Sequence, residues 1–203
     1  MAKVPERGAN PRSVDNIGII GGGTMGSSIA TSCLIAGLSV RLNERDEASL
    51  ERGRQTILSN LDGAVARGKM KADSQQDAEH RLSASIMLSD FDDVDLVVEA
   101  AFEGMGVKIE LFTQLDTICK PGAVLATNTS YLDIDRIAAA TKRPGDVIGL
   151  HFFSPAHIMK LLEVVVADKT APEVVATGFS LAAKLKKSPC GRVFVMVSSA
   201  IAS

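Results

Sequence analysis

The sequence predicts an α/β fold in which helices cover both faces of a doubly wound, mainly parallel β-sheet. Short, continuously apolar segments alternate with helical patterns along the 203 residues, which is typical of strands buried on both faces. A glycine-rich run, G-G-G-T-M-G, joins the first apolar segment to the first helical one. A long charged helical stretch follows the second strand and predicts a helical hairpin inserted at that point.

The first elements follow a polar segment. Residues 1–14 contain proline and glycine but little apolar sequence, and we expect a loose, linker-like arm there. Residues 17–20 (I-G-I-I) form a short apolar run that ends in glycines, which predicts a buried strand. The helical spacing of residues 25–36 stops at Gly37, a residue that suits a helix C-cap. Residues 39–43 predict the second strand.

The middle of the chain contains the hairpin and the next two strands. Residues 46–67 and 72–81 predict the two antiparallel helices of the hairpin. Residues 86–88 predict a short strand, and residues 95–100 (D-L-V-V-E-A) predict a buried one. The amphipathic spacing of residues 107–119 predicts a helix.

The remaining elements continue the alternation. Residues 123–127 follow a Pro-Gly pair and predict a strand, which a short helix over residues 134–140 separates from the strand at 147–150. Residues 161–167 are rich in valine and predict an extended segment. Residues 172–185 predict a helix that begins with a proline.

Composition and charge exclude several classes of protein. The formal net charge of −2 gives no basic surface, so we expect no nucleic-acid partner. The three cysteines, Cys33, Cys119 and Cys190, are scattered, which predicts reduced thiols, a cytoplasmic location and no metal site. The first residues lack the apolar stretch of a signal peptide, and no apolar run approaches the ~18 residues of a membrane span.

The glycine-rich run has the spacing and context of a dinucleotide-binding loop. G-x-G-x-x-G fits Gly21, Gly23 and Gly26, between a predicted strand and a predicted helix. The first glycine permits a tight turn, the second lets the backbone approach a pyrophosphate, and the third lets helix and strand pack closely. The alternative is a glycine-rich turn that binds nothing. The loop favours a Rossmann-like domain over residues 15–189, and its candidate cofactor-binding residues are Gly21, Gly22, Gly23, Thr24, Met25 and Gly26.

Glu44 ends the second predicted strand, at about the ~20-residue offset expected for a ribose-binding acid. A carboxylate there accepts hydrogen bonds from the ribose hydroxyls and repels a 2′-phosphate, which favours NAD over NADP. Arg45 is adjacent and could instead accept a 2′-phosphate. The alternative role of Glu44 is a solvated acid in a turn.

Three polar residues are candidates for catalysis. His151, in H-F-F-S-P, follows an apolar strand, and ligands bind beyond the carboxyl ends of such strands. Glu163, in K-L-L-E-V-V-V, lies among apolar residues where a carboxylate needs a partner, and His151 is the natural one. Ser130, in N-T-S, follows another strand and could bind a substrate oxygen. The alternatives are a packed histidine, an edge-strand acid facing water, and helix N-capping by Ser130 or Asp133.

Several runs together resemble the NAD-binding domain of the 3-hydroxyacyl-CoA dehydrogenases, over about residues 17–189. The runs are I-G-I-I-G-G-G-T-M-G, L-V-V-E-A, A-T-N-T-S-Y-L-D-I and G-L-H-F-F-S-P-A-H-I-M-K-L-L-E-V-V. The H-F-F-S-P-A-H run is also similar to the multifunctional β-oxidation proteins. The arm A-K-V-P is similar to the linker that follows the hydratase half of those fusions.

The resemblance implies roles for individual residues. His151 would be the catalytic base, Glu163 would orient it and Ser130 would bind the substrate oxygen. Asn60 and Arg67 would contact coenzyme A. Many members have asparagine where this chain has Ser154. The candidate cofactor contacts outside the glycine loop are Glu44, Glu103, Lys108, Asn128, Ser130 and Ser154.

The resemblance stops near Pro189. Family members continue into a helical second domain that carries the dimer contacts and begins with a run such as G-V-C-D-G-F-I-G-N-R-I, whereas residues 190–203 read C-G-R-V-F-V-M-V-S-S-A-I-A-S. Synonymous codons for this tail, shifted by one base, encode V-R-A-G-V-C-D-G-F-I-G-N-R-I. We therefore expect an aberrant, frameshifted tail over residues 190–203 and no helical dimerisation domain.

The sequence thus predicts NAD-dependent oxidation of (3S)-3-hydroxyacyl-CoA to 3-oxoacyl-CoA in fatty-acid β-oxidation, with weak or no activity in the chain as written. The cofactor is NAD and the substrate a 3-hydroxyacyl-CoA, and we expect the parent enzyme to be a homodimer. One alternative is a module that binds NAD without turnover. The others are a 3-hydroxybutyryl-CoA dehydrogenase or another hydroxyacid dehydrogenase on the same fold.

Overall fold

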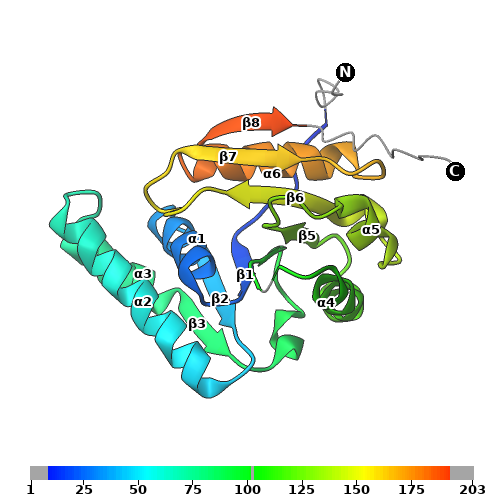
Figure 1. Cartoon of the computed structure of the whole chain (residues 1–203). Coiled ribbons are helices and arrows are strands. Elements are labelled where there is room, and N and C mark those ends of the chain that lie inside the picture. The colour runs from blue at the N-terminus through cyan, green and yellow to red at the C-terminus, as the bar shows by residue number, and fades with distance from the viewer. Residues whose placement is uncertain (1–8, 102, 193–203) are drawn as a thin grey trace, which may run out of the picture.

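A single β-sheet forms the centre of the computed structural model, which describes residues 9–101 and 103–192 (Figure 1). In these residues eight strands lie in the order β3-β2-β1-β4-β5-β6-β7-β8. β1 to β6 are mutually parallel, whereas β7 pairs antiparallel with β6 and β8 runs parallel to β7. The bounds are β1 Asn16–Ile20, β2 Ser39–Asn43, β3 Leu82–Ser85, β4 Leu96–Glu99, β5 Val124–Thr127, β6 Val147–Phe152, β7 Leu161–Val165 and β8 Ser188–Arg192. The predicted mainly parallel α/β sheet is confirmed.

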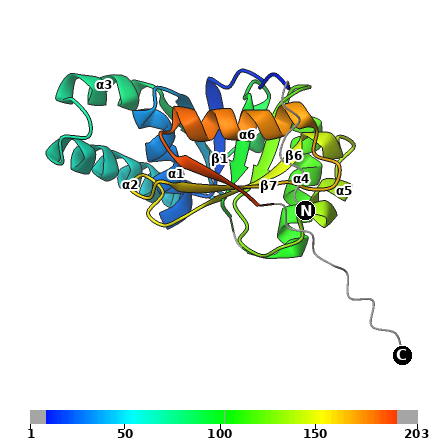
Figure 2. The same cartoon turned by 90° about the horizontal axis from the view of Figure 1, so that it is seen from above.

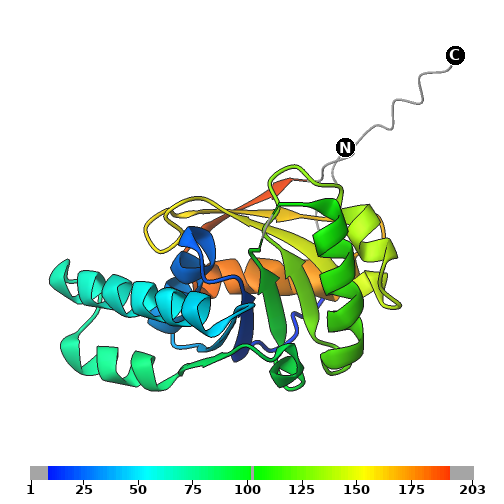
Figure 3. The ribbon, with the colours of Figure 1, turned by 60° about the horizontal axis from the view of Figure 1, so that its bottom comes forward.

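Helices cover both faces of this sheet. The green helix α4 and the orange helix α6 lie on opposite sides of the strands in Figure 3. The helices are α1 Thr24–Ile35, α2 Glu47–Ala66, α3 Ala72–His80, α4 Met105–Ile118, α5 Ile134–Ala139 and α6 Pro172–Lys184, with 3-10 turns η1 Leu88–Phe91 and η2 Pro144–Asp146. α2 and α3 form the predicted hairpin, which extends to one side of the molecule (Figure 2). None of these described helices has the length and apolar character needed to cross a membrane.

The central strands β1, β4 and β5 are mainly apolar because they pack against two separate cores. Ile19 is fully buried in a cluster that includes residues of α1, α2 and α6, whereas Ile20 next to it belongs to a cluster with η1, α4 and α5. Neighbouring side chains of a strand point to opposite faces, so a strand covered on both faces needs apolar residues at consecutive positions. This packing explains why the apolar runs predicted the strands well.

The third strand was placed wrongly from the sequence. Residues 86–88 were expected to form it, but β3 lies just before them, at Leu82–Ser85. β3 is an edge strand whose two central residues are exposed, so it has no apolar run to reveal it. Ile86 and Met87, which suggested the strand, have exposed fractions of 40% and 58%.

A further strand was not predicted at all. β8, Ser188–Arg192, has the sequence S-P-C-G-R, which lacks the β-branched residues that favour strands. It pairs with β7 at the other edge of the sheet. The expected frameshifted tail begins within this strand. Residues 193–203 of that tail, like residues 1–8 of the arm, lie outside the described residues.

Part of the predicted N-terminal arm is anchored, contrary to the expectation of a loose segment. The N–H of Arg12 donates to Thr177 Oγ1 at 2.9 Å, and its guanidinium donates to the Gly122 carbonyl at 3.0 Å. The same guanidinium forms ion pairs with Asp146 at 2.7 Å and Glu173 at 3.2 Å. One side chain thus joins the arm to α6 and to the loops that precede β5 and β6.

Replacing Arg12 should therefore lower stability. We expect Arg12→Ala to reduce the free energy of unfolding by about 1–2 kcal/mol, because hydrogen bonds to a charged group are lost while Asp146 stays largely buried. Urea denaturation followed by circular dichroism measures this. The matched control is Arg54→Ala, whose exposed side chain has a 3.8 Å ion pair with Glu51 and should change little. Equal effects of the two substitutions would show that the arm is not held by Arg12.

Candidate active site

The glycine-rich turn between β1 and α1 is very tight. Gly21 has a φ of +93°, a conformation that suits glycine, and its N–H donates to the Asn43 carbonyl at 3.0 Å. A Cβ on Gly26 would overlap the carbonyl oxygen of Gly21, so no larger residue fits there without displacing the turn. The turn brings the first N–H groups of α1 to the carboxyl edge of the sheet, next to β4, where the strand order reverses.

The start of α1 suits an anionic ligand. Its N-cap is Gly23, no side chain caps its first N–H groups, and no acidic residue lies in its first turn. Thr24 and Met25 are its first two helical residues. Uncapped N–H groups and the positive end of the helix dipole together favour a pyrophosphate here. These residues therefore fit the pyrophosphate of a dinucleotide such as NAD.

Beside this turn lies a cavity of about 720 Å³ that can hold a nucleoside. Glu44 lines it, with its Oε1 accepting the N–H of Gly22 at 2.7 Å. The apolar side chains of Ile86 and Val107 line it too, and they suit the flat face of a base. Arg45 also reaches this cavity, but its side chain is 84% exposed and forms a 3.1 Å ion pair with Asp46.

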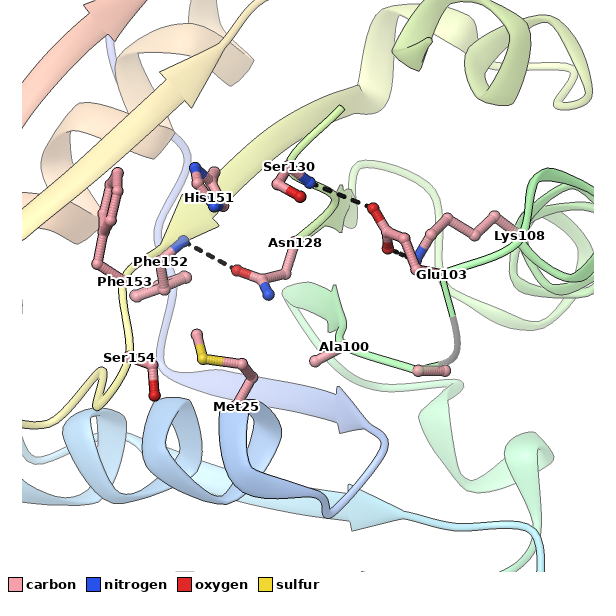
Figure 4. A pocket seen from close by; sticks show the side chains of 11 residues that line it. Met25, Ala100, Glu103, Lys108, Asn128, Ser130, His151, Phe152, Phe153 and Ser154 are labelled. Atoms are coloured by element: carbon pink, nitrogen blue, oxygen red, sulfur yellow. Dashed lines mark hydrogen bonds and ion pairs between the residues drawn. The ribbon is translucent and has the colours of Figure 1, made fainter. Parts of the chain in front are cut away.

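A second cavity, of about 450 Å³, adjoins the first because Ala100 and Ala101 line both. Figure 4 shows side chains from α1, α4 and β6, and from the segments that follow β4 and β5, around it. Seven of the residues singled out from the sequence line it together: Met25, Glu103, Lys108, Asn128, Ser130, His151 and Ser154. The two cavities form one groove along the carboxyl edge, from Glu44 to His151.

His151 and Glu163 form the expected pair. His151 Nδ1 lies 2.8 Å from Glu163 Oε2, and the two side chains are 20% and 13% exposed. They are directly opposite each other in the antiparallel ladder of β6 and β7, so their side chains share one face of the sheet. The sequence placed His151 beyond its strand, but β6 continues through it to Phe152. The ring of Phe153 packs against the imidazole with centroids 4.7 Å apart.

Asn128 and Ser130 follow β5 and face this pair. Asn128 Oδ1 accepts the N–H of Phe152 at 2.8 Å, which fastens the end of β5 to β6 (Figure 4). Asp133, not Ser130, caps α5, because its side chain accepts the N–H groups of Asp135 and Arg136. The capping role considered for Ser130 therefore belongs to Asp133.

The wall of the cavity opposite His151 contains buried charges. Lys108 Nζ lies 2.8 Å from both carboxylate oxygens of Glu99 and 3.1 Å from Glu103 Oε2. Glu99 and Lys108 are 0% and 1% exposed. Glu103 also accepts the hydroxyl of Thr129 and, at 3.3 Å, the N–H of Ser130. Sequence reasoning selected Glu103 and Lys108 but missed Glu99.

Comparison with known proteins agrees with this geometry. The family model for the 3-hydroxyacyl-CoA dehydrogenase, NAD binding domain, matches residues 16–192. The chain belongs to this family. The matched residues include the glycine loop, the pair of His151 and Glu163, and the groove that runs from the loop to that pair.

Individual relatives cover most of this chain. It is 44% identical over 180 residues to the peroxisomal bifunctional enzyme of Cavia porcellus, which covers 88% of the chain and 24% of that protein. It is 41% identical over 179 residues to the peroxisomal fatty acid beta-oxidation multifunctional protein of Oryza sativa subsp. japonica, covering 88% of the chain and 25% of that protein. The chain thus spans about a quarter of each of these curated relatives.

A solved structure shares the fold. The 3-hydroxybutyryl-CoA dehydrogenase of Escherichia coli superposes with a TM-score of 0.86 at 39% identity. The match covers 89% of this chain and 38% of that one. The NAD-binding domain of 3-hydroxyacyl-CoA dehydrogenases is therefore the unit described here, and NAD is its cofactor.

Two residues expected from the family resemblance to contact coenzyme A lie away from the groove. Asn60, on α2, donates to Thr31 Oγ1 at 3.3 Å, and Arg67 follows the end of α2 beside Gly63. Among the described residues, neither lines the two cavities of the groove. Their contact with coenzyme A stays a prediction.

Lys187 is a second residue that sequence reasoning missed. Its side chain is buried, and Nζ donates to the carbonyls of Ala156 at 2.5 Å and Met159 at 2.7 Å. Burial lowers the pKa of this ammonium group. It fastens the loop that follows His151 and carries Ser154. Nothing in K-L-K-K-S-P distinguishes Lys187 from its neighbours, whereas a glutamate ending the buried run L-V-V-E was a usable signal for Glu99.

The tightness of the glycine turn gives a direct test of the cofactor loop. We expect Gly26→Ala to raise the Kd for NADH more than about tenfold, because the added methyl group overlaps the Gly21 carbonyl and displaces the turn from the pyrophosphate, at a cost of about 1–3 kcal/mol. NADH fluorescence titration measures it. Gly106→Ala is the control, because a Cβ on Gly106, in α4, meets no atom within 4 Å. Unchanged NADH affinity in Gly26→Ala would exclude this turn as the pyrophosphate site.

Proposed function

We propose that this chain supplies the NAD-binding and proton-transferring half of an enzyme that oxidises (3S)-3-hydroxyacyl-CoA to 3-oxoacyl-CoA in fatty-acid β-oxidation. The observation that carries the proposal is the pair of His151 and Glu163 at one end of a groove whose other end holds the glycine turn and Glu44. Relatives named as β-oxidation proteins in Oryza sativa and as a bifunctional enzyme in Cavia porcellus support it.

The residues at the reacting end have complementary tasks. Glu163 faces Nδ1 of His151, so Nε2 is the nitrogen that takes the proton of the substrate hydroxyl. The carboxylate then stabilises the imidazolium that forms, as an orienting acid does in other histidine bases. Ser130 lines the same cavity and donates a hydrogen bond to the substrate oxygen. NAD, when bound, supplies the hydride acceptor.

A second candidate function is a module that binds NAD without turnover. It is favoured by the exposure of the reacting end, where a further cavity of about 260 Å³ is also lined by His151 and Glu163. Tyr131 beside it is 67% exposed. Water at the reacting centre weakens electrostatic stabilisation of a transition state. Oxidation of NADH by acetoacetyl-CoA, followed by the loss of NADH absorbance, separates the two, because the binding module shows nucleotide affinity and no turnover.

The role of Glu163 can be tested by removing its charge. We expect Glu163→Gln to lower the turnover of acetoacetyl-CoA on the order of 100-fold, because the imidazolium loses its partner, while NADH affinity changes little. The control is Glu51→Gln, an exposed acid on α2. Turnover close to that of the wild-type chain would show that Glu163 does not orient the base.

Selectivity for NAD is the second test. With Glu44 facing the nucleoside cavity, we expect NADH to bind more tightly than NADPH by about 1–3 kcal/mol, through repulsion of the 2′-phosphate. Parallel fluorescence titrations give the two Kd values. Arg45→Ala should leave the preference in place. If NADPH binds as tightly as NADH, and Arg45→Ala removes that binding, Arg45 and not Glu44 determines selectivity.

Location and assembly are further proposals. We propose a cytoplasmic location, and the support for it is the scattered set of cysteines. The relatives from Cavia porcellus and Oryza sativa are named as peroxisomal proteins. A homodimeric parent enzyme likewise rests on the family resemblance.

A further inference from the structure

Glu99, Lys108 and Glu103 form a connected cluster at the wall of the groove opposite His151. This cluster of two carboxylates and the ammonium group between them is here called the carboxylate triad. Lys108 bridges the two acids, at 2.8 Å from Glu99 and 3.1 Å from Glu103. The other hydrogen bonds to Glu99 come from neutral donors, the hydroxyl of Thr127 at 2.7 Å and the N–H of Ala101 at 2.8 Å. Two carboxylates therefore share one ammonium group.

The carboxylate triad has a surplus of one negative charge. Glu99 and Lys108 are fully buried and Glu103 is 31% exposed, so solvent and salt screen this charge poorly. Glu103 and Lys108 line the cavity of the reacting end, and His151 is the other titratable residue among the described residues that line it. The surplus is thus the dominant fixed charge on that wall.

This position matters for the redox state of the cofactor. Under the proposed function, the reacting end of the groove receives the nicotinamide ring, which is cationic in NAD+ and neutral in NADH. A fixed negative charge at short range favours a cation over a neutral group of nearly the same shape. Shape and hydrogen bonds act on both forms almost equally, but the surplus charge discriminates between them.

We propose that the carboxylate triad shifts the relative affinity of this site toward the oxidised cofactor, and that Glu99, which lines neither cavity of the groove, is a positioning residue that supplies the surplus charge. The inference rests on the proposed function, because it needs the nicotinamide at the His151 end. It opposes the effect of Glu163, which favours positive charge on His151 after oxidation. The balance between the two walls sets the equilibrium between the bound reactants and the bound products, and leaves the overall equilibrium of the reaction unchanged.

The test measures a ratio of affinities instead of activity. Kd values of the chain for NAD+ and NADH are determined by calorimetry and fluorescence, for the wild type, Glu99→Gln and Glu103→Gln. Each substitution cancels the surplus charge. We expect the ratio of the Kd for NAD+ to the Kd for NADH to rise about tenfold in both, as one unit charge at an intermediate effective dielectric implies. That shift equals about 30 mV in the potential of the bound two-electron couple.

A charge-conserving double variant separates charge from structural damage. Glu99→Gln combined with Lys108→Met removes the same buried contacts and more, yet keeps a surplus of one negative charge on Glu103. We expect its ratio to stay near that of the wild type even where both affinities fall. If Glu99→Gln does not fold, the ratio is measured on Glu103→Gln alone. Glu103 is the more exposed acid, so its substitution disturbs the folded core less.

The outcomes are distinct. A ratio within about twofold of the wild type in both single variants overturns the inference, and so does a ratio in the double variant that rises as far as in the single variants. A wild-type chain that binds neither nucleotide overturns the proposed function and this inference together. Binding of both nucleotides with an unchanged ratio in the single variants overturns only the inference.

Discussion

The ammonium group of Lys108 is buried near the start of α4, and the structure around it is arranged to satisfy that charge. An unpaired ammonium ion at 1% exposure would cost several kcal/mol, so Glu99 at the end of β4 must stay within contact. Glu99 in turn accepts the hydroxyl of Thr127 at the end of β5. One buried ion pair therefore fixes a helix start and two strand ends relative to one another, and these three elements form a wall of the groove.

The same contact extends to the residues that face the substrate. Lys108 holds Glu103, and Glu103 accepts hydrogen bonds from Thr129 and Ser130. The loop after β5 is thus positioned from behind by side chains of another helix. Asn128, in the same loop, reaches forward to β6. A segment without regular structure is in this way held from both sides, which suits a loop that must place a hydroxyl group accurately.

Much of the fold and part of the site could be predicted from the sequence because the signals are local. The glycine turn is encoded by residues adjacent in the chain, and Glu44 lies at a fixed offset from it. The buried strands can be recognised in the sequence as apolar runs. The edge strands cannot, because β3 is half exposed and the composition of β8 does not favour a strand, although β8 pairs with β7. Lys187 could not be ranked because its role depends on partners that only the tertiary structure brings near, whereas Glu99 had a usable signal as an acid that ends a buried apolar run.

The antiparallel pairing of β6 and β7 fixes the distance between His151 and Glu163, the two side chains proposed to handle the proton. His151 and Glu163 are opposite each other only in the observed register, and a slip by one residue would turn the carboxylate to the other face of the sheet. On either side of Glu163, Leu162 and Val164 are completely buried in the core. Such a slip would expose both side chains and push Glu163 into the apolar layer. The hydrophobic packing of two leucine- and valine-sized side chains thereby sets the distance between a base and its acid, and substitutions that loosen this core would act on proton chemistry without touching a polar atom.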